Sequence, residues 1–523
     1  MKIAVPPTGQ ATSLRSRLLQ GLAAIFSGQV ILAAANLLLV PLYLTSWSAP
    51  IYGEWLVLFS LVSYLSVLDL GMEMAVGNRL TQAFAIGDLE DYARVQHSAL
   101  ALYLSLAGGA FLLLGVAAWV FPPAWIGLKE TPAAVASWVL WLLGLQIILA
   151  LPMGLIGGIY RTTGNLARSQ WLANCRQVTG LGLLALTLLL GGGMVAASLV
   201  QLIPLLLIPI YVMWDVKRRF PPLMPGLKRA NRQIIREMIN PSLHFALFPL
   251  ANAIILQGPV IIISTVLGGV AVAVFATTRT LVNFIRQIMG SLTNALWPDL
   301  TRMEARQEFL RLRVMHRVLV SGSTALCLGA AAALWYEGPE IIAVWTRGKL
   351  PPDPLLLRIL LLMAVLQIPW LTSATFTAAA NHHHKIARLL LASAVLGVTG
   401  AAVLVHWWGL WGIPVALLVA DALTCAHFVI QDTCVMLGEP YAPFAFRLWG
   451  GLVVAAGLSL LAGWVVHSAL SQFMIVRWLG VGITTSLVSL AVGWRIFLFP
   501  VDRVTVIEQL PFLRGRLGMC RTN

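Results

Sequence analysis

Charged residues are scarce in this sequence. Asp, Glu, Lys and Arg make up 11% of its 523 residues, whereas hydrophobic residues make up 59%. A soluble domain carries about 25% charged residues, and one globular core cannot bury so large an apolar surplus. The scarcity of charge therefore excludes a soluble protein. It predicts a polytopic membrane protein, in agreement with a mean hydropathy of +0.85.

Cysteine pairs and catalytic signatures are also absent. The five cysteines, Cys175, Cys327, Cys425, Cys434 and Cys520, show no paired spacing, which argues against a disulfide framework. The sequence contains no phosphate-binding loop, no nucleophile elbow and no H-E-x-x-H motif. We therefore expect neither an enzyme nor a bound cofactor.

Three adjacent histidines form the only pattern that suggests a metal site. They lie in the run Asn381-His382-His383-His384-Lys385. Consecutive side chains on a helix point about 100° apart, so three adjacent imidazoles do not converge on one ion. We interpret the run as a basic cytoplasmic turn and predict no metal site.

Long apolar segments dominate what the sequence does contain. A spanning helix needs about 20 mostly apolar residues, and this rule predicts an all-α protein with about 14 transmembrane helices. They lie near residues 20–46, 52–72, 98–121, 135–160, 170–191, 194–214, 240–267, 270–297, 316–336, 355–380, 388–406, 409–431, 447–468 and 475–499. The residues before the first segment are polar and basic, so we expect that segment to act as an uncleaved signal-anchor.

Basic residues are distributed unevenly between the two sides of this topology. With the N-terminus inside, the inner segments hold 28 lysines and arginines and the outer loops hold four. Basic loops are retained on the cytoplasmic side, so we predict that both termini are cytoplasmic. The net charge of +15 then reflects orientation and contact with membrane lipids, and no nucleic-acid partner is expected.

A basic segment at residues 215–239 divides the predicted helices into six before it and eight after it. We interpret it as a cytoplasmic linker on anionic lipid. A weak repeat supports the division, because Leu80 and Leu300 both lie in amphipathic segments that follow a spanning helix, and their residue numbers differ by 220. We predict six-helix bundles at residues 1–214 and 240–432, then two extra helices and a tail at residues 433–523.

Two arginines lie inside the predicted helix at residues 270–297. Arg279 and Arg286 are seven residues apart, hence about 20° apart on one face and roughly 10 Å apart along the axis, with Asn283 between them. An ionisable group at the centre of a membrane helix costs at least about 2.5 kcal/mol, so it faces a partner or a wet cavity. One interpretation is an anion-binding stripe whose guanidinium forks match a diphosphate. The other is an ion pair with Glu54, Asp69 or Asp421.

Three acidic residues lie at the ends of the second predicted helix. Glu54 lies at its outer end, and Asp69 and Glu73 lie at its inner end. Each is either a polar helix end or part of a gate or coupling site for a proton or another cation. The coupling ion, H⁺ or Na⁺, stays open. Asp421 and His427 on the twelfth helix are attributed to packing or to a buried polar pair.

Residues 36–80 and 277–305 carry a resemblance to a known family. The features are Asn36, Pro41, Tyr52-Gly53 and Asp69-Leu70-Gly71 in the first segment and Pro298, which closes the arginine-bearing helix, in the second. Both segments resemble Wzx-type polysaccharide flippases of the multidrug/oligosaccharidyl-lipid/polysaccharide (MOP) exporter superfamily. The resemblance implies two six-helix bundles around a V-shaped central cavity, with two extra helices. It also implies flipping of an undecaprenyl-diphosphate-linked oligosaccharide across the bacterial inner membrane by alternating access.

The resemblance further implies that cations in the cavity meet the diphosphate. Arg279, Asn283 and Arg286 fit that role, and surface polysaccharide such as O-antigen is the expected product. Other polysaccharide-assembly proteins are possible partners. The first helix departs from the family pattern. Arg15 and Arg17 lie at its cytoplasmic end, and residues 20–46 contain no basic residue. A cavity with basic residues from both halves is therefore not expected.

Three other functions compete with this one. A multidrug exporter of the same superfamily would favour acidic residues in its cavity. The two arginines at mid-membrane argue against this function. A membrane glycan polymerase or ligase would need outer loops with acid–base groups. The outer loops here are short and contain few charged residues. A scaffold that transports nothing would leave the cost of the buried charges unexplained.

Overall fold

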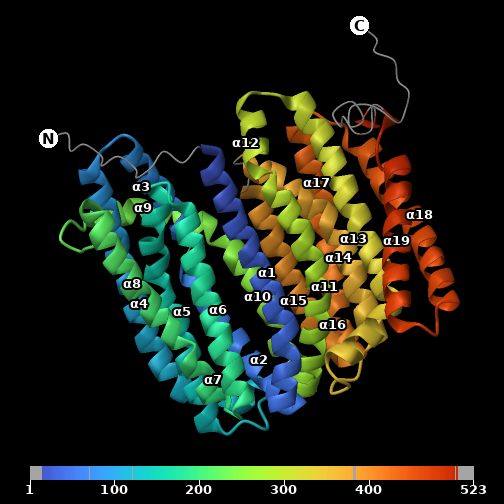
Figure 1. Ribbon diagram of the computed structural model, residues 1–523, viewed down its shortest axis with the longest axis horizontal. Helices are drawn as coiled ribbons and strands as arrows, with labels where there is room; N and C mark the ends of the chain where they lie inside the picture. Colours follow the sequence, from blue (N-terminus) through green and yellow to red (C-terminus); the bar gives the residue numbers. More distant parts are fainter. Residues whose placement is uncertain (1–13, 70, 121, 381–383, 501, 504–523) are drawn as a thin grey trace. The chain divides into compact units, whose positions relative to one another are not determined.

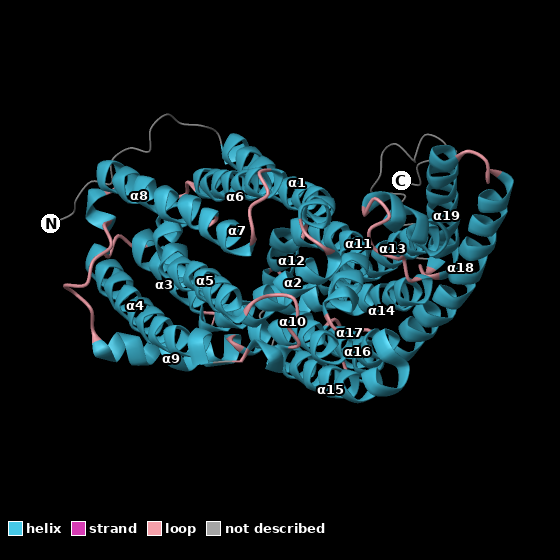
Figure 2. Ribbon diagram, turned by 90° about the horizontal axis from the view of Figure 1, so that it is seen from below, coloured by secondary structure: helices cyan, strands magenta, loops and turns pink. Residues whose placement is uncertain are grey.

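The chain is helical throughout the part that the structure describes. This computed structural model describes residues 14–69, 71–120, 122–380, 384–500 and 502–503. Figures 1 and 2 show helices joined by short loops, and these ranges contain no strand. The prediction of an all-α, multi-pass membrane protein is confirmed. Most of the predicted histidine turn, residues 381–383, and both chain ends lie outside the described residues.

The chain forms two compact helical units that divide between Pro249 and Leu250. The first unit begins with α1 (Leu14–Ser46), α2 (Ala49–Ser63), the 3₁₀ turn η1 (Tyr64–Asp69) and α3 (Met72–Ala85). It continues with α4 (Leu89–Val120), η2 (Pro123–Ile126), α5 (Ala133–Thr162) and α6 (Leu166–Leu189), and ends with α7 (Met194–Val200), α8 (Leu202–Arg219), η3 (Pro221–Leu223) and α9 (Arg232–Phe245). Within it α1 packs on α6 and α4 packs on α5.

The second unit takes most of α10 (Leu247–Leu267) and all later helices. These are α11 (Gly269–Ala295), α12 (Trp297–Ala305), α13 (Phe309–Trp345), α14 (Pro354–Ala379), α15 (His384–Trp408), η4 (Gly409–Trp411), α16 (Gly412–Leu423), α17 (Cys425–Met436), α18 (Tyr441–Ala469) and α19 (Met474–Ile496). Helix α14 lies at the centre of the packing, because it contacts α11, α13, α16 and α17.

Twelve helical stretches among the described residues are long and apolar enough to cross a membrane, against fourteen expected. Two features explain the difference. The expected segments 388–406 and 409–431 fall within one stretch, Lys385–Met436. The expected segment 270–297 forms α11, which is not among the twelve, because its arginines and other polar residues lower its hydropathy.

Two helices begin at side chains that cap their first backbone amides. Ser48 precedes α2, and its Oγ accepts a hydrogen bond from the Ile51 amide at 3.5 Å. Asp353 precedes α14 and accepts from the amides of Leu355 and Leu356 at 3.1 and 3.0 Å. Each helix then begins with or next to a proline, which needs no amide partner at that position.

Left-handed turns recur in the two units at the same spacing as the predicted repeat. Gly87 has φ of 78° and Gln307 has φ of 58°; Gly127 has φ of 76° and Arg347 has φ of 54°. The residue numbers in each pair differ by 220. The backbone hydrogen bonds of the turns also correspond, since the residue after each left-handed one donates to the carbonyl five residues before it. The internal repeat therefore exists in the backbone as well as in the sequence.

The short helices before these turns are anchored by equivalent leucines. Leu80 in α3 and Leu300 in α12 are each 1% exposed. Leu80 packs into a core with Tyr92 and Tyr103, whereas Leu300 packs with Leu312. The repeat thus places the same apolar anchor in both units.

Helices α18 and α19 extend the second unit beyond the repeat and pack on α13. Thr485 Oγ1 on α19 donates to the Gly329 carbonyl at 2.8 Å, and Ser489 Oγ donates to the Ala325 carbonyl at 2.7 Å. A Cβ added at Gly329 would lie 2.6 Å from the Ser486 Cα. Small residues therefore let the two helix backbones approach closely, as is common in membrane helix pairs.

Candidate functional site

The predicted arginine stripe lines a small cavity in the second unit. Arg279, Asn283 and Arg286 all face it from α11. The other walls are Ile255 and Leu256 of α10, Leu360, Met363, Ala364 and Gln367 of α14, and Leu417 of α16, with Phe275 and Val282 of α11. The cavity volume is about 30 Å³, roughly the share of one water molecule in the liquid. The three polar residues thus lie together, as their helical spacing predicts, and none of the lining residues is acidic.

Arg279 is held by groups that carry no negative charge. Its Nη1 donates to the Leu256 carbonyl at 2.7 Å, and its guanidinium lies 5.2 Å from the centre of the Phe275 ring. Among the described residues, neither Arg279 nor Arg286 has an ion pair with a carboxylate within 4.0 Å. Neither arginine is therefore directly ion-paired in this part of the chain, although Arg286 interacts electrostatically with Asp421.

Asp421 is the carboxylate of the second unit that interacts electrostatically with Arg286. It is 3% exposed and accepts a hydrogen bond from Trp370 Nε1 at 3.0 Å. Gln367, which lines the cavity, also bonds to Asp421. Asp421 thus interacts electrostatically with the stripe although it does not line the cavity. His427 lies elsewhere, where Nδ1 is 2.6 Å from the Tyr441 hydroxyl.

Glu54 is a structural acceptor within the first unit. Its side chain is 1% exposed, and its two oxygens accept from the backbone amides of Lys129, Glu130 and Thr131 at 2.6, 2.9 and 2.8 Å. Glu54 therefore fixes the loop before α5.

Asp69 and Glu73 have separate partners near the inner end of the second predicted helix. Asp69 Oδ1 accepts from the Tyr103 hydroxyl at 2.8 Å. Glu73 pairs with Arg161 at 3.2 Å, and both side chains are about half exposed. The structure brings these two acids to neighbouring positions, but only Glu73 lines a cavity.

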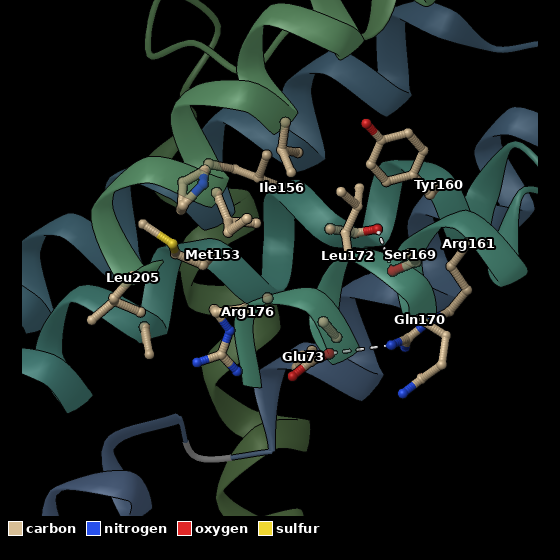
Figure 3. Close-up of a pocket in the computed structure, with 17 residues that line it drawn as sticks. Glu73, Met153, Ile156, Tyr160, Arg161, Ser169, Gln170, Leu172, Arg176 and Leu205 are labelled. Atoms are coloured by element: carbon tan, nitrogen blue, oxygen red, sulfur yellow. Dashed lines mark hydrogen bonds and ion pairs between the residues drawn. The ribbon is translucent and has the colours of Figure 1, made fainter. Parts of the chain in front are cut away.

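That second cavity lies within the first unit and has a volume of about 370 Å³. Helices α3, α5, α6 and α8 form its walls, and Figure 3 shows the Glu73–Arg161 ion pair at its edge. Its polar lining residues are Glu73, Tyr160, Arg161, Ser169, Gln170 and Arg176. The volume falls within the 300–1,000 Å³ of typical ligand pockets, so this cavity has room for an organic head group.

Arg176 was missed as a candidate residue. It lies within the predicted helix at residues 170–191. Helix α6 begins at Leu166, so Arg176 lies ten residues into it, a rise of about 15 Å. The cost of an ionisable group inside a predicted membrane helix singled out Arg279 and Arg286, and the same cost applies to Arg176.

Beside this cavity, Asp215 gathers three groups at the end of α8. Tyr160 donates its hydroxyl proton to Asp215 at 2.6 Å, Arg168 donates twice at 3.0 and 2.8 Å, and Arg219 donates at 2.9 Å. Asp215 is 2% exposed. Its charge is thus fully compensated, which makes it a structural ion-pair centre rather than a free acid.

Comparison with known proteins identifies the fold. No protein-family model and no curated protein matches the sequence. Among solved structures, an inward-facing multidrug resistance MATE family transporter of the MOP superfamily matches with a TM-score of 0.64 and 16% identity, over 79% of this chain and 94% of that one. An outward-facing structure of that description gives 0.60 and 15%, over 81% and 96%. The MATE multidrug transporter DinF-BH gives 0.58 and 17%, over 81% and 94%. The chain therefore has the fold of the MATE transporters of the MOP superfamily.

Proposed function

We propose that this chain is a MOP-type exporter that moves its substrate across a membrane by alternating access. The shared fold carries the proposal, because the neighbours are transporters and are described in inward-facing and outward-facing conformations. The resemblance in residues 36–80 and the excess of basic residues on one side support a bacterial inner membrane with both termini in the cytoplasm.

Multidrug export is the substrate class best supported by the comparisons, since the neighbours include multidrug transporters. The test is expression in a bacterial strain that lacks its own drug exporters. Resistance to amphipathic cations and efflux of a cationic dye should rise several-fold over a strain with empty vector. Unchanged susceptibility and efflux, with the protein present in the membrane at normal level, would refute this function.

Flipping of a lipid-linked oligosaccharide diphosphate is the second candidate, and one observation favours it. Arg279 and Arg286 face a cavity in the second unit that no acidic residue lines, and Asn283 lies between them. A cationic drug would be repelled there, whereas guanidinium groups bind phosphate oxygens in bidentate geometry. A cavity of about 30 Å³ is too small for a diphosphate, so binding requires α10, α11 and α14 to separate.

Substitution of the arginines tests this candidate. Arg279→Ala and Arg286→Ala should each reduce surface glycan and increase the lipid-linked precursor, because loss of one hydrogen-bonded charge contact costs about 1.5–3 kcal/mol. That cost is roughly a 10- to 100-fold loss of affinity. The Lys variants should be intermediate, and Asn283→Ala should have a smaller effect. Arg311→Ala is the matched control, since Arg311 is 70% exposed on α13. Normal glycan export by both Ala variants would exclude the stripe as the diphosphate contact.

We also propose Glu73 as the gate or coupling residue of the three predicted acids. It faces the larger cavity, and its ion-pair partner Arg161 is half exposed. Glu73→Gln should remove the dependence of transport on a proton gradient, with Asp69→Asn as the comparison. Transport by Glu73→Gln that keeps its full dependence on the gradient would refute this role.

A further inference from the structure

Three buried side chains that are strong metal ligands meet in the second unit. They are His316 near the start of α13, Cys434 near the end of α17 and Glu439 just before α18. One ligand atom from each lies within 4.8 Å of the others. His316 and Cys434 are 0% exposed and Glu439 is 5% exposed. None of them belongs to the arginine stripe or to the cavity of the first unit.

Two of the ligand atoms face each other without a hydrogen bond. His316 Nδ1 and Glu439 Oε2 are both buried and unpartnered within the described structure, and they are 3.6 Å apart. An N–H···O hydrogen bond is normally 2.7–3.2 Å long. Two atoms bound to one tetrahedral ion at about 2.1 Å would be roughly 3.4 Å apart. The observed separation is thus closer to that of two ligands than to that of a hydrogen bond.

The surroundings of His316 determine which ring nitrogen carries the proton. Ser373 Oγ donates its only proton to the Pro369 carbonyl at 2.9 Å. With that proton directed at the carbonyl, His316 Nε2, 3.0 Å from the same Oγ, is the donor in their hydrogen bond. In neutral imidazole this leaves a lone pair on Nδ1, directed at the Glu439 carboxylate. Two acceptors face each other there, and a cation between them would satisfy both.

Charge around the cluster also favours a cation. Glu439 and Asp502 share one guanidinium, that of Arg317, which binds Glu439 Oε1 and leaves Oε2 free. Arg313 lies close by but donates to the Leu437 carbonyl rather than to a carboxylate. Two carboxylates therefore share one directly paired guanidinium. Metal-bound ligands are typically held by such outer hydrogen bonds.

We propose that His316 Nδ1, Cys434 Sγ and Glu439 Oε2 form a binding site for one divalent metal ion of the zinc class. Imidazole, thiolate and carboxylate together suit Zn²⁺, whereas Mg²⁺ and Ca²⁺ prefer oxygen ligands alone. Binding releases the Cys434 thiol proton, because the thiolate is the ligand. The ion joins α13, α17 and the start of α18. At the equivalent position of the repeat in the first unit, Gln96 bonds instead to the Leu223 carbonyl at 3.2 Å, so the site is specific to the second unit.

Metal content of the purified full-length protein in detergent tests the proposal. The wild type, after dialysis against a weak chelator, should retain a single zinc ion per chain. Cys434→Ser should lower zinc affinity by at least about 100-fold, and Ser373→Ala, which only orients His316, by roughly 10- to 100-fold. Cys327→Ser is the matched control, because Cys327 is an equally buried cysteine outside the cluster.

Cobalt substitution provides a readout that does not depend on affinity. Cobalt-loaded wild type and Cys327→Ser should show the thiolate-to-cobalt charge-transfer absorption, and Cys434→Ser should lack it. If Cys434→Ser is not monodisperse, Glu439→Gln serves as the second variant, with zinc retention as the measurement. Wild-type protein that binds neither zinc nor cobalt, or a Cys434→Ser variant with unchanged zinc affinity, overturns the proposal.

Discussion

Replacing Glu54 by Gln should loosen the loop before α5. The carboxylate accepts three backbone bonds, from Lys129 and Glu130 at Oε1 and from Thr131 at Oε2. The single oxygen of Gln can keep the first two. Its NH₂ group would then face the Thr131 amide, donor against donor. One charge-assisted bond is lost and one partly buried N–H becomes unpaired, which together cost about 3 kcal/mol.

Hydrogen exchange measures this cost locally. Because 1.4 kcal/mol corresponds to a factor of ten, the Thr131 amide should exchange roughly 100-fold faster in Glu54→Gln than in the wild type when local opening limits exchange. Glu130→Gln is the control, since that side chain is exposed in the same loop. The reasoning is refuted if exchange at Thr131 is unchanged. If transport is lost while exchange stays at the wild-type rate, Glu54 acts in coupling rather than in holding the loop.

Four further substitutions probe the fold. Gln307→Gly should stabilise the protein by up to about 1 kcal/mol, because glycine tolerates the left-handed conformation. Gly87→Gln should destabilise it by about 1–2 kcal/mol for the same reason. Thermal unfolding in detergent measures both changes. Asp215→Asn should lower the unfolding temperature, because removing one member of a buried ion-pair group costs about 3–5 kcal/mol, and an unchanged midpoint would contradict the arrangement. Gly329→Leu should separate α19 from α13, since even a Cβ there would lie 2.6 Å from the Ser486 Cα, and protease accessibility of α19 reports it.

Helical periodicity was enough to predict the arginine stripe. Arg279, Asn283 and Arg286 recur at intervals that place them on one face of α11, and all three line one cavity. Periodicity could not reveal which groups complete that cavity. Gln367 comes from α14, which α12 and α13 separate from α11 along the chain, and only packing brings it there.

Single-residue chemistry was a weaker guide. Glu54 was interpreted as either a helix-end acid or part of a gate or coupling site. Its partners are backbone amides about 75 residues away, which leave no trace in side-chain patterns. The adjacent histidines His382, His383 and His384 were the ones considered as metal ligands from the sequence. The histidine that lies beside a cysteine and a glutamate is His316. Its partners lie much later in the chain, Cys434 in α17 and Glu439 just before α18. Groups that converge through tertiary packing have no fixed spacing for a motif to detect.

The paired left-handed turns have a consequence for engineering this protein. Gly87 and Gly127 enclose a helix–turn segment of the first unit, and Gln307 and Arg347 enclose its counterpart in the second. Because the chain enters and leaves both segments through the same backbone geometry, these turns are natural crossover points for recombination. A chimaera that carries one segment in both places would retain its turns while losing, or doubling, the side chains that are particular to that segment.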